Sequence, residues 1–97
     1  KDLPSDYNPP ARLAIAYGEV GRYDDALAAA DRALKLVYGP RKIRIYSTKA
    51  GILEKKGDRE AAKAALAEAL TYAEGLPKAQ VSARGIEAIR TRIAKLG

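Results

Sequence analysis

Two similar stretches of sequence decide the fold of this protein. Residues 21–34 are GRYDDALAAADRAL, and residues 57–70 are GDREAAKAALAEAL. Each stretch begins with a glycine and continues with alanine and leucine at matching positions, at a spacing of 36 residues. A unit that recurs at roughly this period is typical of a stacked repeat fold, because a single unit cannot bury its own apolar face.

Glycine and proline divide the chain into segments with helical periodicity. Asn8 before Pro9 predicts a helix start, and Gly21 and Gly57 predict turns that follow helices. Asp58 is placed to cap the helix that follows it. The first seven residues are expected to form an extended lead-in. The spacing of apolar residues predicts helices over about 8–20, 23–37, 41–56, 58–74 and 77–96.

The same spacing predicts which residues face the core. In the first two helices these are Leu13, Ala16, Tyr17 and Val20, then Tyr23, Ala26, Leu27, Ala30, Ala33, Leu34 and Val37. In the other three they are Tyr46, Ala50 and Leu53, then Ala62, Leu66, Ala69, Leu70 and Ala73, then Ile86, Ile89, Ile93 and Leu96. The segment KIRIYST at 42–48 also alternates as a strand would. We expect it to be helical, because a lone strand has nothing to pair with in this chain.

The residues at these positions resemble the tetratricopeptide repeat (TPR) family. That family pairs two antiparallel helices in about 34 residues, with small and aromatic residues first, a glycine at the turn, and alanines and a leucine afterwards. The matching residues are Ala14, Tyr17, Gly21, Tyr23, Ala26, Ala33 and Leu34, then Tyr46, Ala50, Leu53, Gly57, Ala62, Ala69 and Leu70. The resemblance implies an all-α, TPR-like α-solenoid of two antiparallel helix pairs, 8–37 and 41–74, with a C-terminal capping helix at 77–96.

The resemblance covers residues 8–96 and departs from the family pattern in places. Pro10 stands where the family has tryptophan, Ala14 where glycine is usual, and Arg59 where the first unit has Tyr23. Because the chain begins at Lys1 rather than methionine, we expect it to be a piece of a longer polypeptide. A fainter similarity is to the C-terminal segments of some bacterial thioredoxin-fold proteins, although no residue here carries redox chemistry.

The composition argues against several classes of function. The chain has no histidine and no cysteine, so it lacks the usual nucleophile–base pairs and the usual zinc ligands. We therefore expect no catalytic residue, no metal and no cofactor. No apolar run is long enough to span a membrane. The net charge of +6 is compatible with nucleic acid, but no nucleic-acid-binding signature is present. Tyr17, Tyr23 and Tyr46 occupy packing positions, while Tyr38 and Tyr72 near helix ends are left open. The sequence leaves the compartment open between cytoplasm and periplasm.

Basic residues concentrate in particular helices. Residues 41–56 carry six basic side chains and one acidic, and residues 77–97 carry five basic and one acidic. Residues 22–37 are neutral, and residues 58–74 have a net charge of −2. In the TPR family the first helix of each pair lines a concave surface, so the resemblance places the cations there. By repeat position, the residues expected on that surface are Asn8, Arg12, Arg44, Thr48, Arg84 and Glu87.

Two functions remain open at this point. One is a protein–protein interaction module that binds an acidic partner protein or peptide through charge-assisted hydrogen bonds from these cations. The other is an assembly or accessory domain of a larger bacterial protein, or a homo-oligomerisation unit, in which an apolar surface such as that of the last helix matters more than a groove. A basic face that serves only solubility would explain the same charges.

Overall fold

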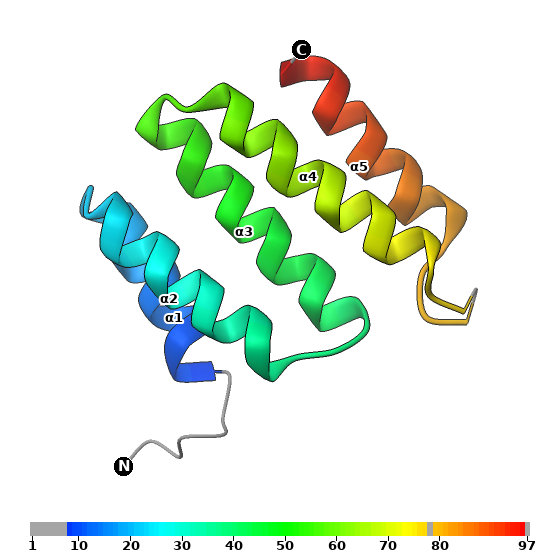
Figure 1. Cartoon of the computed structure of the whole chain (residues 1–97), viewed down its shortest axis with the longest axis horizontal. Helices are drawn as coiled ribbons and strands as arrows, with labels where there is room; N and C mark the ends of the chain where they lie inside the picture. The colour runs from blue at the N-terminus through cyan, green and yellow to red at the C-terminus, as the bar shows by residue number, and fades with distance from the viewer. Residues whose placement is uncertain (1–7, 78, 97) are drawn as a thin grey trace.

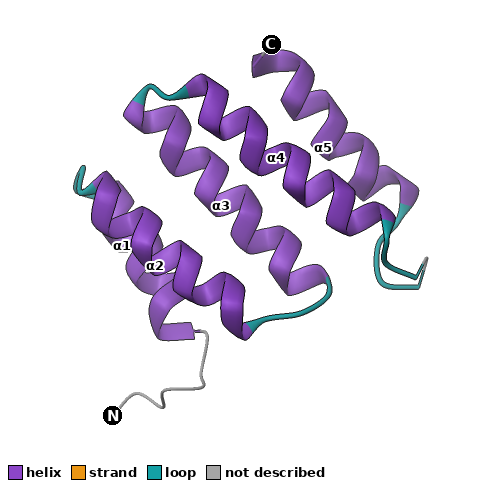
Figure 2. Cartoon of the chain, in the orientation of Figure 1, coloured by secondary structure: helices purple, strands orange, loops and turns teal. Residues whose placement is uncertain are grey.

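The protein folds into five helices that stack side by side (Figures 1 and 2). The computed structural model describes residues 8–77 and 79–96, with side chains from residue 11 onward. The predicted lead-in at 1–7 therefore lies outside the described residues. The helices are α1 (Asn8–Glu19), α2 (Tyr23–Leu36), α3 (Pro40–Lys56), α4 (Arg59–Glu74) and α5 (Ala83–Leu96). The described residues contain no strand, so the expected all-α, TPR-like architecture is confirmed, and residues 42–48 are helical.

The turns within the two helix pairs share one hydrogen-bond pattern. The Gly57 N–H donates to the Glu54 carbonyl at 3.0 Å, and the Asp58 N–H donates to the Leu53 carbonyl at 2.9 Å. The first pair repeats this pattern 36 residues earlier, with Gly21 donating to Gly18 and Arg22 to Tyr17. Both glycines have positive φ, 83° at Gly21 and 91° at Gly57. A side chain would strain this backbone, so the glycines allow the sharp reversal that brings each pair together.

The core consists mostly of alanine and lies on two sides of α3. On one side Ile45 and Ile52 pack against α1 and α2, and on the other Ala50 and Leu53 pack against α4. Small side chains allow helix backbones to approach closely, so α3 is held between its neighbours. The buried residues on the α1–α2 side are Ala14, Ala26, Ala29, Ala30, Ala33, Val37, Ile45 and Ile52, and on the α4 side Ala50, Leu53, Ala62, Ala65 and Leu66.

The structure corrects the expected core face of α1. Ala14 and Gly18 are buried, whereas Leu13 is 38% exposed and Val20 is 70% exposed. Ala16 is exposed as well, and among the four expected residues Tyr17 alone packs against the core. The prediction was wrong because α1 has apolar residues on two sides, and periodicity alone does not say which side has a neighbour.

The structure places the start of α5 at Ala83, six residues after the expected start at 77. The Ser82 hydroxyl oxygen accepts a hydrogen bond from the Gly85 N–H at 3.0 Å, which is the geometry of a helix N-cap. Along α5, Ile89, Ile93 and Leu96 pack against the cluster shared by α3 and α4. They are half-buried, so the last helix closes the stack as the capping helix was expected to do. None of the helices in the described part of the chain has the length and apolar character to cross a bilayer.

The N-cap of α4 provides a test of the local structure. The Asp58 Oδ1 accepts a hydrogen bond from the Ala61 N–H at 3.1 Å. Replacing Asp58 with alanine is expected to lower the free energy of unfolding by about 1 kcal/mol, measured by urea denaturation. Asp58→Asn keeps an oxygen acceptor, so its free energy of unfolding should fall much less. Equal losses in the two variants would show that the cap is not the cause.

Candidate partner-binding surface

A shallow groove separates α1 from α3. It has a volume of about 150 Å³ and is lined by Ile15, Gly18, Glu19, Thr48, Gly51, Ile52 and Lys55. We call this depression the α1–α3 groove. Thr48, Gly51 and Lys55 are spaced three and four residues apart, so they lie on one side of α3. Arg44, four residues before Thr48, belongs to the same side. Both helices are the first members of their pairs.

Two glycines line the groove. Gly18 of α1 is buried, and a Cβ built there would lie 3.4 Å from the Ile52 side chain of α3. The two helices therefore approach closely at this point. A Cβ at Gly51 would lie 3.7 Å from Arg92 Nη2, which means that a guanidinium from α5 rests near the α3 backbone. The surface beside the groove thus includes a side chain from the capping helix.

Arg92 joins α5 to α3. Its Nη1 donates to the Ser47 hydroxyl at 2.6 Å and to the Ser47 carbonyl at 3.4 Å, and its Nη2 donates to a Glu54 carboxylate oxygen at 3.0 Å. The Arg92 side chain is 35% exposed. Because two nitrogens of one planar guanidinium donate at once, this contact fixes the orientation of α5 relative to α3 as well as their separation. None of the three residues was among the predicted site residues.

Most cations of α3 are engaged in packing rather than available to a partner. Lys49 pairs with Asp31 of α2 at 2.9 Å, and Lys56 pairs with Asp24 of α2 at 3.1 Å. Lys42 lies over the Tyr72 ring of α4, with its Nζ 5.2 Å from the ring centroid. Positive charge in the α3 sequence is therefore distributed around the whole helix. Arg44 and Lys55 are exposed and make no ion pair within the described residues.

The predicted site residues lie in different places. Arg44 and Thr48 are adjacent on α3, where the Thr48 hydroxyl donates to the Arg44 carbonyl at 3.2 Å. Arg12 is exposed on α1, one turn before the groove residue Ile15. Arg84 is exposed at the start of α5. The side chain of Asn8, the first residue of α1, lies outside the described residues.

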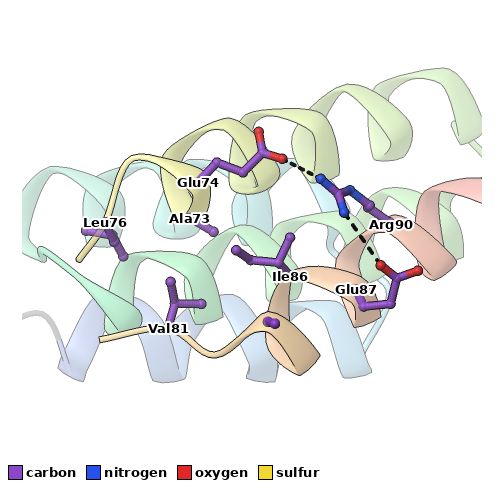
Figure 3. A pocket seen from close by; sticks show the side chains of 8 residues that line it. Ala73, Glu74, Leu76, Val81, Ile86, Glu87 and Arg90 are labelled. Carbon is purple, nitrogen blue, oxygen red and sulfur yellow. Dashed lines mark hydrogen bonds and ion pairs between the residues drawn. The ribbon is translucent and has the colours of Figure 1, made fainter. Parts of the chain in front are cut away.

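Glu87 lies on a different side of α5 from the residue that reaches α3. It pairs with Arg90 at 3.5 Å, and Arg90 pairs with Glu74 of α4 at 2.8 Å (Figure 3). Five residues separate Glu87 from Arg92, which corresponds to roughly 140° around a helix. The structure therefore joins Glu87 to the α4–α5 contact.

The same contact borders a pocket between the end of α4 and the start of α5. It has a volume of about 330 Å³, and Figure 3 shows Leu76, Val81 and Ile86 around it, with the Glu74–Arg90–Glu87 pairs at one side. The Arg90 guanidinium is already paired with two carboxylates, so the pocket offers mainly apolar surface. The pocket lies beside the turn that connects α4 to α5.

A second shallow pocket, between α3 and α4, has tyrosine walls. Tyr46 and Tyr72 line it together with Ala67, Glu68 and Thr71. Burial raises the pKa of the Tyr46 phenol above its usual value, and the nearby Glu68 carboxylate raises it further. The Tyr72 hydroxyl accepts a hydrogen bond from the Gly39 N–H at 2.7 Å and so secures the α2–α3 linker. Within residues 8–77 and 79–96, no group of acidic side chains is arranged to hold a metal ion.

One comparison with known proteins identifies the central helix pair. Residues 43–75 match the family model of the tetratricopeptide repeat. These residues form a tetratricopeptide repeat. The match covers most of α3 and all of α4, a third of the chain, and the first helix pair of this TPR-like fold reproduces the turn of the second. Comparison with curated proteins found no significant match. Comparison with solved structures found none either.

The match at residues 43–75 indicates a general kind of function. A tetratricopeptide repeat is in general a non-catalytic module for protein–protein interaction. The sequence placed Thr48 and Arg44 on the face that such modules present, and the structure puts Thr48 in the α1–α3 groove. Sequence reasoning missed Ser47, Glu54 and Arg92. The spacing of Ser47 and Glu54 by seven residues, which places both on one side of a helix, was a usable signal. Nothing local in the sequence indicated their partner on α5.

The Arg92 contact should contribute to the attachment of the capping helix. Replacing Arg92 with alanine leaves the Ser47 and Glu54 groups without this donor, and we expect a loss of about 1 kcal/mol because the site is partly exposed to solvent. Hydrogen exchange should become faster in α5 before it does in α2.

Arg90 supplies the matched control for this prediction. It comes from the same helix, but its carboxylate pairs are about half exposed, so Arg90→Ala should cost less. An equal or larger effect of Arg90→Ala on the stability and exchange of α5 would contradict the role given to Arg92.

Proposed function

We propose that this chain is a protein–protein interaction module that binds an acidic segment of a partner protein along the α1–α3 groove. The observation that carries the proposal is the separation of the α3 cations into two groups. Lys49 and Lys56 are neutralised by α2, whereas Arg44 and Lys55 lie on the groove side and make no ion pair within the described residues. An acidic segment would supply carboxylate partners for the Arg44 and Lys55 side chains.

The geometry of the groove supports an extended or helical peptide rather than a small molecule. Arg44 and Lys55 are eleven residues apart, which is about 16 Å along a helix. A ligand that contacts both must therefore span several residues. Glu19 stands on the opposite wall and disfavours carboxylates close to α1, so the acidic groups of the ligand are expected to lie along α3. Arg12 is exposed on α1 one turn before the groove residue Ile15, so it adds a positive charge beside the groove.

A fluorescence anisotropy titration tests this proposal. The probes are a labelled glutamate-rich peptide and a lysine-rich peptide of equal length. The Arg44→Gln/Lys55→Gln variant is expected to bind the glutamate-rich peptide about tenfold more weakly, equivalent to about 1.4 kcal/mol. Binding by the unaltered chain should weaken as salt is raised, because the contacts are exposed charges.

The chain offers a closely matched control on α2. Arg32→Gln/Lys35→Gln removes the same two residue types from exposed positions on α2, and Lys35 occupies the last turn of its helix as Lys55 does. Circular dichroism confirms that both variants fold. Equal weakening in the two variants would indicate general attraction between charges and would refute a groove site. Unchanged binding in the Arg44/Lys55 variant, or tighter binding of a single-stranded oligonucleotide than of the peptide, would also refute it.

A second candidate function is supported by a different surface. The domain could act chiefly in assembly, as an accessory unit of a larger protein or as a homo-oligomerisation unit. The apolar residues of α5 that suggested this are half-buried against the rest of the protein. A more exposed apolar face lies at the other end of the stack, where Leu13 of α1 is 38% exposed and Val20, directly after α1, is 70% exposed.

A further inference from the structure

One side of α1 is apolar and exposed. Leu13 is 38% exposed and Val20 is 70% exposed, and Ala16 between them is exposed too. Val20 directly follows the last residue of α1, and its N–H donates to the Ala16 carbonyl at 3.3 Å, so it continues the helical turn. We call these three residues the outer face of α1. Their spacing of three and four residues places them on one side of the helix. Ile15, also exposed, belongs instead to the α1–α3 groove.

The internal repeat shows what this face does elsewhere in the same chain. A shift of 36 residues places Leu13, Ala16 and Val20 onto Lys49, Ile52 and Lys56 of α3. In α3 that side is the docking side for the preceding helix pair. Ile52 is buried in the α1–α2 cluster, and the two lysines pair with aspartates of α2.

In α1, apolar residues replace both lysines, so the corresponding face is more apolar than in α3. No other described helix packs against it as α2 packs against α3. An exposed apolar face at a position that forms a helix contact elsewhere in the chain is typical of a protein–protein contact surface.

The charged residues beside this face can pair with the same residues of a second copy. Arg12 and Glu19 are exposed, have opposite charge and make no ion pair within the described residues. They are seven residues apart, so they lie on the same side of α1 at opposite ends. If two copies of α1 pack antiparallel about a twofold axis near Ala16, Leu13 lies opposite Val20 of the partner. The same arrangement brings Arg12 close to Glu19 of the partner, and each contact occurs twice.

The opposite end of the stack does not offer an equivalent surface. The exposed side of α5 carries Arg84, Glu87, Thr91 and Lys95, so it is polar where the outer face of α1 is apolar. Head-to-tail growth would bury these charges against an apolar face, which is unfavourable. A contact of α1 with α1 closes after two copies.

We propose that the chain forms a twofold symmetric dimer through the outer face of α1. Leu13 and Val20 supply the apolar contact, the small Ala16 side chain allows close approach at the axis, and Arg12 and Glu19 set the antiparallel orientation. The occupant is a second copy because a twofold axis near Ala16 pairs each of these features with its complement. The dimer shares Glu19 with the wall of the α1–α3 groove but leaves Arg44 and Lys55 on another helix. The Arg44→Gln/Lys55→Gln variant therefore tests the peptide groove without changing a residue of the dimer contact.

Sedimentation equilibrium of the full 97-residue chain tests the dimer directly. We expect a mass that rises with concentration toward twice that of the monomer. Leu13→Glu/Val20→Glu should give a monomer across the same range, while its circular dichroism stays unchanged because both residues are exposed. Tyr38→Glu is the matched control, since Tyr38 is 83% exposed but lies in the α2–α3 linker. It should leave the dimer intact.

Reversing the charges tests the orientation. Arg12→Glu or Glu19→Arg alone places like charges together at two symmetric sites, so each should raise the dimer dissociation constant roughly twofold to thirtyfold. The double variant exchanges the two charges and should restore most of the affinity. The double variant changes both copies of a symmetric dimer, so the exchanged charges can pair again. A different partner protein would keep its own charges, and the affinity would not be restored. A monomer at every concentration, a dimer that survives Leu13→Glu/Val20→Glu, or a double variant weaker than both single variants would overturn the proposal.

Discussion

The fold depends on the close approach of helices that bury alanine. α3 has neighbours on both sides, and the side chains at these contacts are mainly alanine with a few isoleucines and leucines. Because an alanine core buries little area per residue, each contact must be long and closely fitted to stabilise the fold. The glycine turns at Gly21 and Gly57 make this possible by holding each helix pair in one register. Gly18 has a related role between α1 and α3, where it lies against Ile52.

The charged residues fall into two groups with different roles. One group joins helices: Lys49 and Lys56 hold α3 to α2, Arg92 holds α5 to α3, and Arg90 holds α5 to α4. These contacts supplement a small apolar core with directional links. The other group, which includes Arg44 and Lys55, has no such role within the described residues. Because structural pairs already neutralise much of the charge, the net charge of a helix overstates what it can offer to a partner.

The two ends of the stack differ in character. At the C-terminal end, α5 covers the apolar surface of α4 with one side and presents charged residues on the other. At the N-terminal end, α1 presents leucine and valine where α3 has lysines. A repeat stack requires a cover at each end, since every unit has two apolar sides. This protein carries one cover within the described residues, and the proposed dimer would supply the second.

The sequence by itself determined the number, type and order of the helices. Glycine turns, proline positions and the periodicity of alanine and leucine are local properties, and they placed α2, α3 and α4 within one or two residues of their observed ends. The helix-pair architecture followed from the repeat of GRYDDALAAADRAL in GDREAAKAALAEAL. Repeat position also predicted that Thr48 and Arg44 share one side of α3, and the role of that side in binding stays a prediction.

The tertiary structure alone decided which apolar residues are buried and which charged residues are paired with one another. Leu13 and Val20 have the periodicity of core residues but are exposed, because burial depends on a neighbouring helix and not on the helix itself. Glu87 joined Arg90 rather than the groove, and Arg92 reached Ser47 and Glu54 from a distant part of the chain. Pairing between charges depends on distances of a few ångströms between separate helices. Local sequence carries no information about those distances, and packing sets them.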